Sequence, residues 1–248
     1  MTALEIPLNR TLGGTGVLSG PASGAQFDRV VELVGKSLTL LAELALNGGV
    51  ENENGLNSKL SRFITNMAYQ EKLPYFAQRE SMEDETRGNS PAPDIGIYLY
   101  IKDIAEFPPK VTVFEGKRLT TSLERKRRRE YVVGHEEEGK HICCGGIERF
   151  KLSIHARDFD RAGIIGYVQD GSPDSWFEQI NAWISELSTG AHDPKWSERE
   201  RLEALSAKGR LASCTSMVCR RDDQLHLTHL WIVLRRDKGS AADRLLKN

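Results

Sequence analysis

Long apolar runs are absent from this sequence of 248 residues. No stretch reaches the roughly 18 apolar residues that a membrane-spanning helix needs. The first ten residues, MTALEIPLNR, also lack the apolar segment of a secretory signal peptide. We therefore expect a cytoplasmic protein that does not have a membrane as a partner.

Cysteine is scarce. The chain has four cysteines, of which Cys143 and Cys144 are adjacent, and this pattern does not make a disulfide framework in a chain of this length. A zinc site is the alternative, and its candidate ligands are His141, Cys143, Cys144, Cys214, Cys219, His226 and His229. The ligand types suit zinc, but their spacing matches none of the usual zinc-binding patterns. Buried free thiols are therefore the favoured interpretation.

An overall excess of positive charge is also absent, since the formal net charge is -1. This excludes a protein that coats DNA through its total charge, but phosphate contacts need only one positive face. Positive charge is concentrated in one unbroken run, which consists of Arg125, Lys126, Arg127, Arg128 and Arg129.

The composition is that of a globular protein, with 39% hydrophobic and 28% charged residues. Residues 1–25 are rich in Gly, Ser and Thr without a sustained period, which predicts a flexible segment. The remaining residues, 26–248, are enough for one substantial core. We therefore expect a single domain without internal repeats.

Hydrophobic periodicity predicts alternating helices and strands. Helices are expected from Phe27 to a stop at Gly48-Gly49, over 57–69 with Asn57 as the cap, over 147–156, over 174–187 with a cap at Ser172 or Asp174, and over 195–209. Thr121 and Glu124 form the pattern of a capping box, which predicts a further, basic helix. Strands are expected over 75–80, 94–101, 111–117, 163–168, 211–219 and 225–234. The fold class is therefore α/β, with a mixed central sheet flanked by helices.

The segment with the most chemical information is PAPDIGIYLYIKDIAEFPPKVTVFEGK. Asp94 begins one predicted strand, and Glu115 lies near the end of the next. If the two strands pair, both carboxylates converge at the same edge of the sheet. Lys117 follows Glu115 by two positions, so strand alternation places it on the same face.

Two carboxylates at one point are suitable ligands for Mg²⁺ or Mn²⁺, which prefer oxygen ligands. Such an ion lowers the pKa of a bound water and neutralises the charge of a phosphate. A neighbouring lysine can orient that water or stabilise the developing negative charge. The pattern therefore favours a catalytic group of Asp94, Glu115 and Lys117, with Asp94 and Glu115 as the metal ligands. Gly116, which lies between Glu115 and Lys117, is expected to let a phosphate approach closely.

Pro93-Asp94 and Glu115-Gly116-Lys117, in this order of predicted elements, resemble the motif of the PD-(D/E)xK, or restriction-endonuclease-like, nucleases. The resemblance covers roughly residues 57–170 and implies an αβββαβ core, with residues 171–248 as a C-terminal extension. It implies a metal-dependent nuclease that hydrolyses DNA, for example the effector subunit of an anti-phage defence or DNA-repair system. The alternative is a nuclease-like subunit that binds or assembles without turnover.

The resemblance also implies an accessory carboxylate from the first helix or strand. Glu71 and Glu80 both qualify by position, and the alternation of the strand favours Glu80 as a fourth catalytic residue. A solvated surface glutamate is the competing interpretation for each. The isolated histidines His135, His141 and His155 have no partner at an informative spacing, so structural or surface roles are expected for them.

The basic run has two interpretations. It is either a solvated helix face or a contact to the phosphate backbone of DNA, and its place after the catalytic strand favours the contact. Arg118, next to the motif, is expected to contact a phosphate near the site.

The last third of the chain carries more large apolar residues than the predicted core requires, among them Trp176, Trp183 and Trp231. Either this part folds back onto the same core, or it is a contact surface. Cutting both strands of DNA requires two active sites, and two-fold pairing is the commonest way to obtain them. We therefore expect a homodimer or a complex with a larger protein.

Overall fold

The computed structural model describes residues 24–45, 52–101, 107–190, 192 and 194–234. Two sequence predictions lie outside these residues. One is the flexible segment 1–25, except for the two residues that begin the first helix. The other is the helix stop at Gly48-Gly49.

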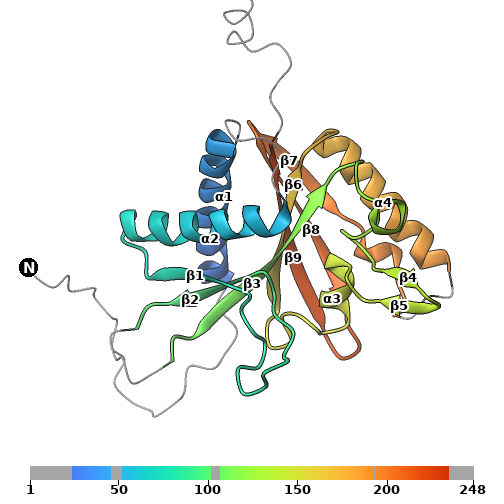
Figure 1. Ribbon diagram of the computed structural model, residues 1–248, viewed down its shortest axis with the longest axis horizontal. Helices are drawn as coiled ribbons and strands as arrows, with labels where there is room; N and C mark the ends of the chain where they lie inside the picture. Colours follow the sequence, from blue (N-terminus) through green and yellow to red (C-terminus); the bar gives the residue numbers. More distant parts are fainter. Residues whose placement is uncertain (1–23, 46–51, 102–106, 191, 193, 235–248) are drawn as a thin grey trace, which may run out of the picture.

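A mixed seven-stranded sheet forms the centre of the described structure, in the order β1-β2-β3-β6-β9-β8-β7 (Figure 1). Neighbours in the group β1-β2-β3 are antiparallel, as are those in β9-β8-β7, whereas β3, β6 and β9 are parallel. The strands are β1 Tyr75–Arg79, β2 Ile95–Leu99, β3 Lys110–Leu119, β6 Arg161–Val168, β7 Glu203–Lys208, β8 Leu211–Cys219 and β9 Gln224–Val233. The predicted α/β class with a mixed sheet is confirmed.

Helices cover both faces of this sheet. Helices α1 (Gly24–Ala45) and α2 (Glu53–Gln70) lie against one face, and α3 (Gly146–Lys151) and α4 (Pro173–Thr189) lie against the other (Figure 1). Strand β6 contributes Ile164 to one core and Ile165 to the other. This explains why β6 has a continuous apolar run in place of an alternating pattern.

Helix α2 begins earlier than the sequence predicts. Its cap is Asn52, whose side chain accepts a hydrogen bond from the backbone N–H of Gly55 at 2.8 Å. The predicted cap, Asn57, is instead buried in the helix, where it accepts a hydrogen bond from the Tyr167 hydroxyl at 2.7 Å. The apolar period indicates a start near Asn57, whereas the helix begins at Glu53. The helix start at Glu53 brings that residue into the first helical turn.

The predicted basic helix after Thr121 is wrong. Only one 3-10 turn, η1 (Arg125–Arg127), forms there, and Glu124 makes no capping hydrogen bond from its side chain. The Thr121 N–H and hydroxyl instead donate to the carboxylate of Asp170. A small hairpin follows, made of β4 (His135–Glu137) and β5 (Lys140–Ile142).

Two other predicted helices also need correction. The helix expected over 147–156 ends at Lys151, and Ser153 and Ala156 adopt positive φ angles of 54° and 56° beyond it. The helix expected over 195–209 is absent. Its sequence forms the turn η2 (Glu198–Glu200) and strand β7, which pairs with β8. Sheet pairing overrides the helix-forming composition of this segment.

The C-terminal third folds back onto the same core, which was one of the two alternatives. Trp176 and Trp183 are each 8% exposed and Trp231 is 0% exposed, all within one hydrophobic cluster. The cap of α4 at Ser172 is confirmed. The surplus of apolar residues is thus used inside the chain. No described helix combines the length and the apolar character needed to span a membrane.

A buried ion pair connects α3 to the turn η2, and the same lysine also contacts strand β8. The Lys151 ammonium group donates to Glu200 at 2.6 Å and to the carbonyl of Cys219 at 3.0 Å. The side chains of Lys151 and Glu200 are 3% and 0% exposed. Removal of one partner leaves a buried charge without compensation.

We predict that Lys151→Ala lowers the free energy of unfolding by about 3–5 kcal/mol. The control is Lys126→Ala, which removes an exposed ion pair with Glu137 and should change stability little. Urea unfolding of the two variants measures the difference. Equal effects would show that the Lys151 pair does not connect these elements energetically.

Candidate functional site

Asp94 and Glu115 lie at the same end of the β2–β3 strand pair. The antiparallel register pairs Ile95 with Phe114, so the next step along each strand brings Asp94 opposite Glu115. Directly opposed residues of antiparallel strands project to one face. The Asp94 carboxylate also accepts a hydrogen bond from the Gly116 N–H at 2.8 Å. The pairing that the sequence predicts therefore exists.

Lys117 completes this group as the alternation of β3 predicts. Its ammonium group lies 2.8 Å from Oε1 of Glu115 and 3.6 Å from Oε1 of Glu53. Glu115 is 1% exposed and Lys117 is 6% exposed, so both charges lie inside the protein. The ammonium group therefore contacts both carboxylates and compensates their negative charge.

Glu53 is the member of this group that the sequence analysis missed. It occupies the first turn of α2, and its Oε2 accepts a hydrogen bond from the Arg118 N–H at 3.2 Å. The available signal was Asn52 followed by an acidic residue, a common start of a helix. A helix that begins at Asn57, as the sequence predicts, leaves Glu53 outside it in a loop.

The structure does not bring the two expected accessory carboxylates to Glu115. Glu80 forms an ion pair with Arg79 at 2.7 Å, and its side chain is 71% exposed. Its backbone N–H donates to the carbonyl of Asp94, so Glu80 is close in the sheet while its carboxylate is engaged elsewhere. Glu71 forms an ion pair with Lys36 at 3.0 Å on the surface.

Two further residues contact Glu115, one in α3 and one that follows this helix. Arg149 donates to Oε1 of Glu115 at 2.9 Å, and Nε2 of His155 lies 3.4 Å from Oε2. The sequence predicts only a structural or surface role for His155. Its contact is not visible there because α3 and β3 are joined through a turn and a hairpin of unpredicted length.

The charges of this group shift its pKa values strongly. Burial alone would raise the pKa of Glu115, but the positive charges of Lys117 and Arg149, and that of His155 when it is protonated at low pH, lower this pKa to about 2. Burial favours the neutral form of Lys117, yet the carboxylates of Glu115, Glu53 and Asp94 raise its pKa above the usual value. Glu115 and Lys117 are thus an ionised, buried pair.

Asp94 behaves in the opposite way. Burial, and then the neighbouring charge of Glu115, raise the pKa of Asp94 to about 7. Burial also lowers the pKa of His155 to about 4, which keeps the ring neutral at physiological pH. Two carboxyl groups with widely separated pKa values at one point are characteristic of functional sites.

Gly116 is a glycine for a different reason from the one expected. A Cβ at this position would lie 2.2 Å from Oδ1 of Asn57. The small residue is therefore required by the packing of α2 on β3, and the expected approach of a phosphate is not needed to explain it.

The basic run is largely paired with acids of the chain itself. Lys126 contacts Glu137 at 2.6 Å, Arg127 contacts Glu130 at 2.7 Å, and Arg129 contacts Glu186. Of the basic residues expected to contact DNA, three make no side-chain ion pair with the described part of the chain, namely Arg118, Arg125 and Arg128.

The seven residues of the suggested zinc site do not gather. His229 is buried in the core, where its ring nitrogens contact the hydroxyls of Tyr131 and Ser216. Cys214 is buried on β8, and burial raises the pKa of its thiol to about 12. Cys144 instead lies beside His135 and Glu130.

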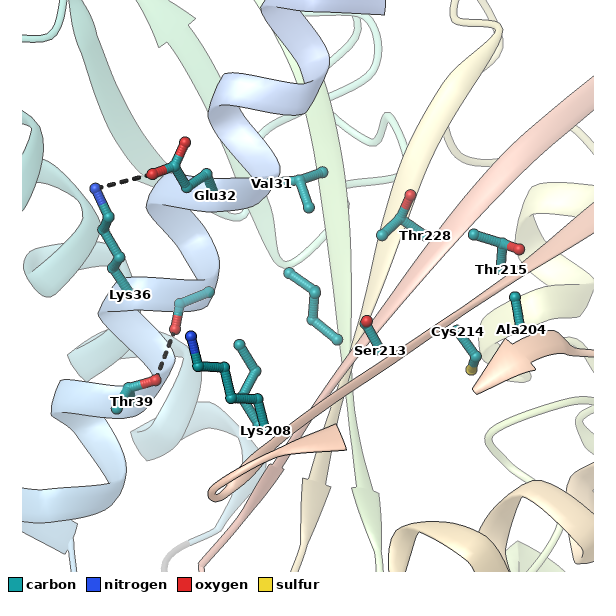
Figure 2. Close-up of a pocket in the computed structure, with 13 residues that line it drawn as sticks. Val31, Glu32, Lys36, Thr39, Ala204, Lys208, Ser213, Cys214, Thr215 and Thr228 are labelled. Carbon is teal, nitrogen blue, oxygen red and sulfur yellow. Dashed lines mark hydrogen bonds and ion pairs between the residues drawn. The ribbon is translucent and has the colours of Figure 1, made fainter. Parts of the chain in front are cut away.

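A separate hollow of about 550 Å³ lies between α1 and the strands β7, β8 and β9 (Figure 2). Its lining includes Val31, Ser213 and Thr228, and Glu32 is paired with Lys36 at 3.1 Å. This lining lacks a second carboxylate and a histidine, so the group around Glu115 is the stronger candidate site. Comparison of the chain with protein-family models, curated proteins and solved structures finds no match.

The raised pKa of Asp94 makes stability depend on pH. A carboxyl group whose pKa rises from 3.8 to about 7 on folding binds its proton more tightly in the folded state. Its contribution is complete below the unfolded pKa and is lost as the pH rises through the folded one.

We predict that the wild-type protein loses roughly 2–4 kcal/mol of unfolding free energy relative to Asp94→Asn between pH 5 and pH 8. The asparagine amide in this variant can still accept the hydrogen bond from Gly116 but does not titrate. Urea unfolding at both pH values measures the difference. Parallel pH profiles for the two proteins would contradict the raised pKa.

Proposed function

We propose that this protein is a metal-dependent nuclease of the PD-(D/E)xK type that hydrolyses phosphodiester bonds in DNA. The observation that carries the proposal is the convergence of Asp94, Glu115 and Lys117 at one end of the β2–β3 pair. Glu53 joins them from the first turn of α2. Glu53 comes from a separate part of the sequence, so its contact with Lys117 does not follow from the motif alone.

The arrangement of elements supports the same proposal. Helix α2, strands β1, β2 and β3, helix α3 and strand β6 occur in the order expected for an αβββαβ core, with η1 and the β4–β5 hairpin inserted between β3 and α3. The first three strands are antiparallel neighbours, and β6 is parallel to β3. The motif residues lie in β3 and just before β2, as the resemblance implies.

The residues around Glu115 fit a divalent cation. Oε2 of Glu115 is buried and accepts no hydrogen bond among the described residues. Lys117 and Arg149 supply the positive charge that this carboxylate needs. Oxygen ligands from Asp94 and Glu115, with Glu53 nearby, suit Mg²⁺ or Mn²⁺.

Each residue has a distinct role in this proposal. Asp94 and Glu115 would hold the ion, which would supply positive charge at the scissile phosphate and make the attacking water more acidic. Lys117 directs its ammonium group toward the water and the developing charge. Asp94 would have to be ionised in order to hold the ion, with its proton released to solvent, and its pKa of about 7 allows this near neutral pH. Arg149, whose side chain is 30% exposed, leaves Glu115 to contact a phosphate.

The alternative is a nuclease-like binding subunit without turnover. The observation that favours it is the burial of Glu115 and Lys117 behind Arg149. If Arg149 stays in place, neither metal nor substrate reaches Glu115. Pairing of two chains, or binding to a larger protein, remains a prediction for either alternative. Because the tryptophans are buried in the core, such an interface must use another surface.

We predict that Lys117→Ala reduces nicking of plasmid DNA in Mg²⁺ or Mn²⁺ by at least about 100-fold, because the lysine acts on the reacting water. The matched control is Lys36→Ala, which removes an exposed lysine paired with Glu71 and should nick at the wild-type rate. Conversion of supercoiled to open-circular plasmid measures both. DNA binding by the wild type without nicking would favour the binding subunit.

The unpaired arginines should carry the DNA contacts of the basic run. We predict that Arg125→Ala/Arg128→Ala lowers the slope of log affinity against log salt concentration by about 1.8, or about 0.9 for each of the two phosphates that these side chains neutralise. The control is Arg87→Ala/Arg201→Ala, which removes two arginines that are paired with Asp84 and Glu198. Fluorescence anisotropy of a labelled duplex at several salt concentrations gives the slopes. An unchanged slope would identify the run as a solvated surface.

A further inference from the structure

A second group of ligand-type side chains lies outside the site around Glu115. Glu130, His135 and Cys144 each offer one ligand atom, and these atoms lie within 4.8 Å of one another. The Cys144 sulfur is 3.4 Å from Nδ1 of His135 and 3.6 Å from Oε1 of Glu130. Among the described residues, no other group of three histidine, cysteine, aspartate or glutamate side chains brings its ligand atoms this close together.

The backbone holds these three residues in place before any ligand binds. The Gly146 N–H donates to the carbonyl of Glu130 at 2.8 Å, and the Cys144 N–H donates to that of Ile142 at 2.9 Å. His135 is fixed by its pairing with Ile142 in the β4–β5 hairpin.

Two glycines allow the close approach at the base of the hairpin. A Cβ on Gly134 would lie 1.8 Å from the carbonyl oxygen of Ile142. A Cβ on Gly145 would lie 2.4 Å from Cα of Val133. The ligand atoms therefore meet on a tightly packed scaffold, and a metal does not have to order a flexible loop in order to bind.

The environment already compensates the negative charge of this group. Glu130 is 8% exposed and accepts a hydrogen bond from Arg127 at 2.7 Å. The Arg127 side chain is 39% exposed, so it can turn toward solvent when another cation takes its place. His135 and Cys144 are half-buried, which leaves space for a water molecule as a fourth ligand.

We propose that Glu130, His135 and Cys144 form a zinc-binding site. One sulfur, one nitrogen and one oxygen ligand, with water in the fourth position, match the tetrahedral preference of Zn²⁺. A thiolate ligand disfavours Mg²⁺ and Ca²⁺. Binding converts the thiol of Cys144 to a thiolate and releases its proton to solvent.

A metal at this position would connect three segments of the chain. Glu130 follows η1, His135 lies in β4, and Cys144 leads into α3. Because α3 carries Arg149 to Glu115, the zinc site would fix the segment that positions this arginine.

The neighbouring residues His141, Cys143 and Glu148 provide an internal comparison. Nε2 of His141 lies 2.6 Å from Glu148 and Nδ1 lies 3.2 Å from Glu136, so both ring nitrogens are already engaged. Cys143 is adjacent to Cys144 in the sequence, but it is not one of the three residues whose ligand atoms lie close together. Replacement of Cys143 by serine is the matched control for Cys144→Ser.

The test is a titration of the metal-free, full-length protein with Co²⁺, which substitutes for Zn²⁺ and gives a thiolate-to-cobalt charge-transfer band. The wild type and Cys143→Ser should show this band at one equivalent, and Zn²⁺ should abolish it. Cys144→Ser should lack it, and His135→Asn should bind Co²⁺ at least about 10-fold more weakly. The proposed ligands of the site around Glu115 are carboxylates and not cysteines, so Co²⁺ bound there would not give a thiolate-to-cobalt band.

Thermal unfolding gives a second readout that does not depend on colour. A hundredfold excess of Zn²⁺ over its dissociation constant should raise the midpoint of the wild type by about 5–10 °C and leave that of Cys144→Ser unchanged. Circular dichroism checks that each variant is folded. If Cys144→Ser is not folded, His135→Asn replaces it as the variant that lacks a ligand. Absence of the band in the wild type, its persistence in Cys144→Ser, or its equal loss in Cys143→Ser would overturn the proposal.

Discussion

The buried charge of Glu115 is the constraint on which the candidate site depends. A carboxylate at 1% exposure cannot be solvated, so the protein must compensate it from within. Lys117 does so from the same strand, and Arg149 does so from α3. Without these partners Glu115 would be protonated or the core around it would open. The charge thus ties β3 to α3 and fixes the positions of the other polar groups.

The same charge separates the behaviour of the two carboxyl groups. Glu115 has the positively charged partners and stays ionised, whereas the half-buried Asp94 keeps its proton up to a pKa of about 7. A divalent cation would reverse this difference, because it stabilises both carboxylates in their charged form. In the proposed function, a bound cation would therefore replace part of the internal compensation of Glu115.

Local patterns predict the elements that hold the motif. Alternation along β3 places Glu115 and Lys117 on one face, and the pairing of neighbouring strands brings Asp94 to them. Glu53 escapes prediction because the apolar period of α2 points to a later start, at Asn57. The contacts of Arg149 and His155 with Glu115 depend on the turn and hairpin between β3 and α3, which have no periodic signal. The composition of β7 predicts a helix, and pairing with β8 overrides it.

The most direct test of the account is a crystal structure of the full chain soaked in Mn²⁺. Anomalous scattering locates the ion without reference to activity. We expect a peak between the carboxylates of Asp94 and Glu115, with Arg149 moved away from Glu115 and Lys117 still beside it. Absence of a peak there, with Arg149 and Lys117 unchanged on Glu115, would contradict it.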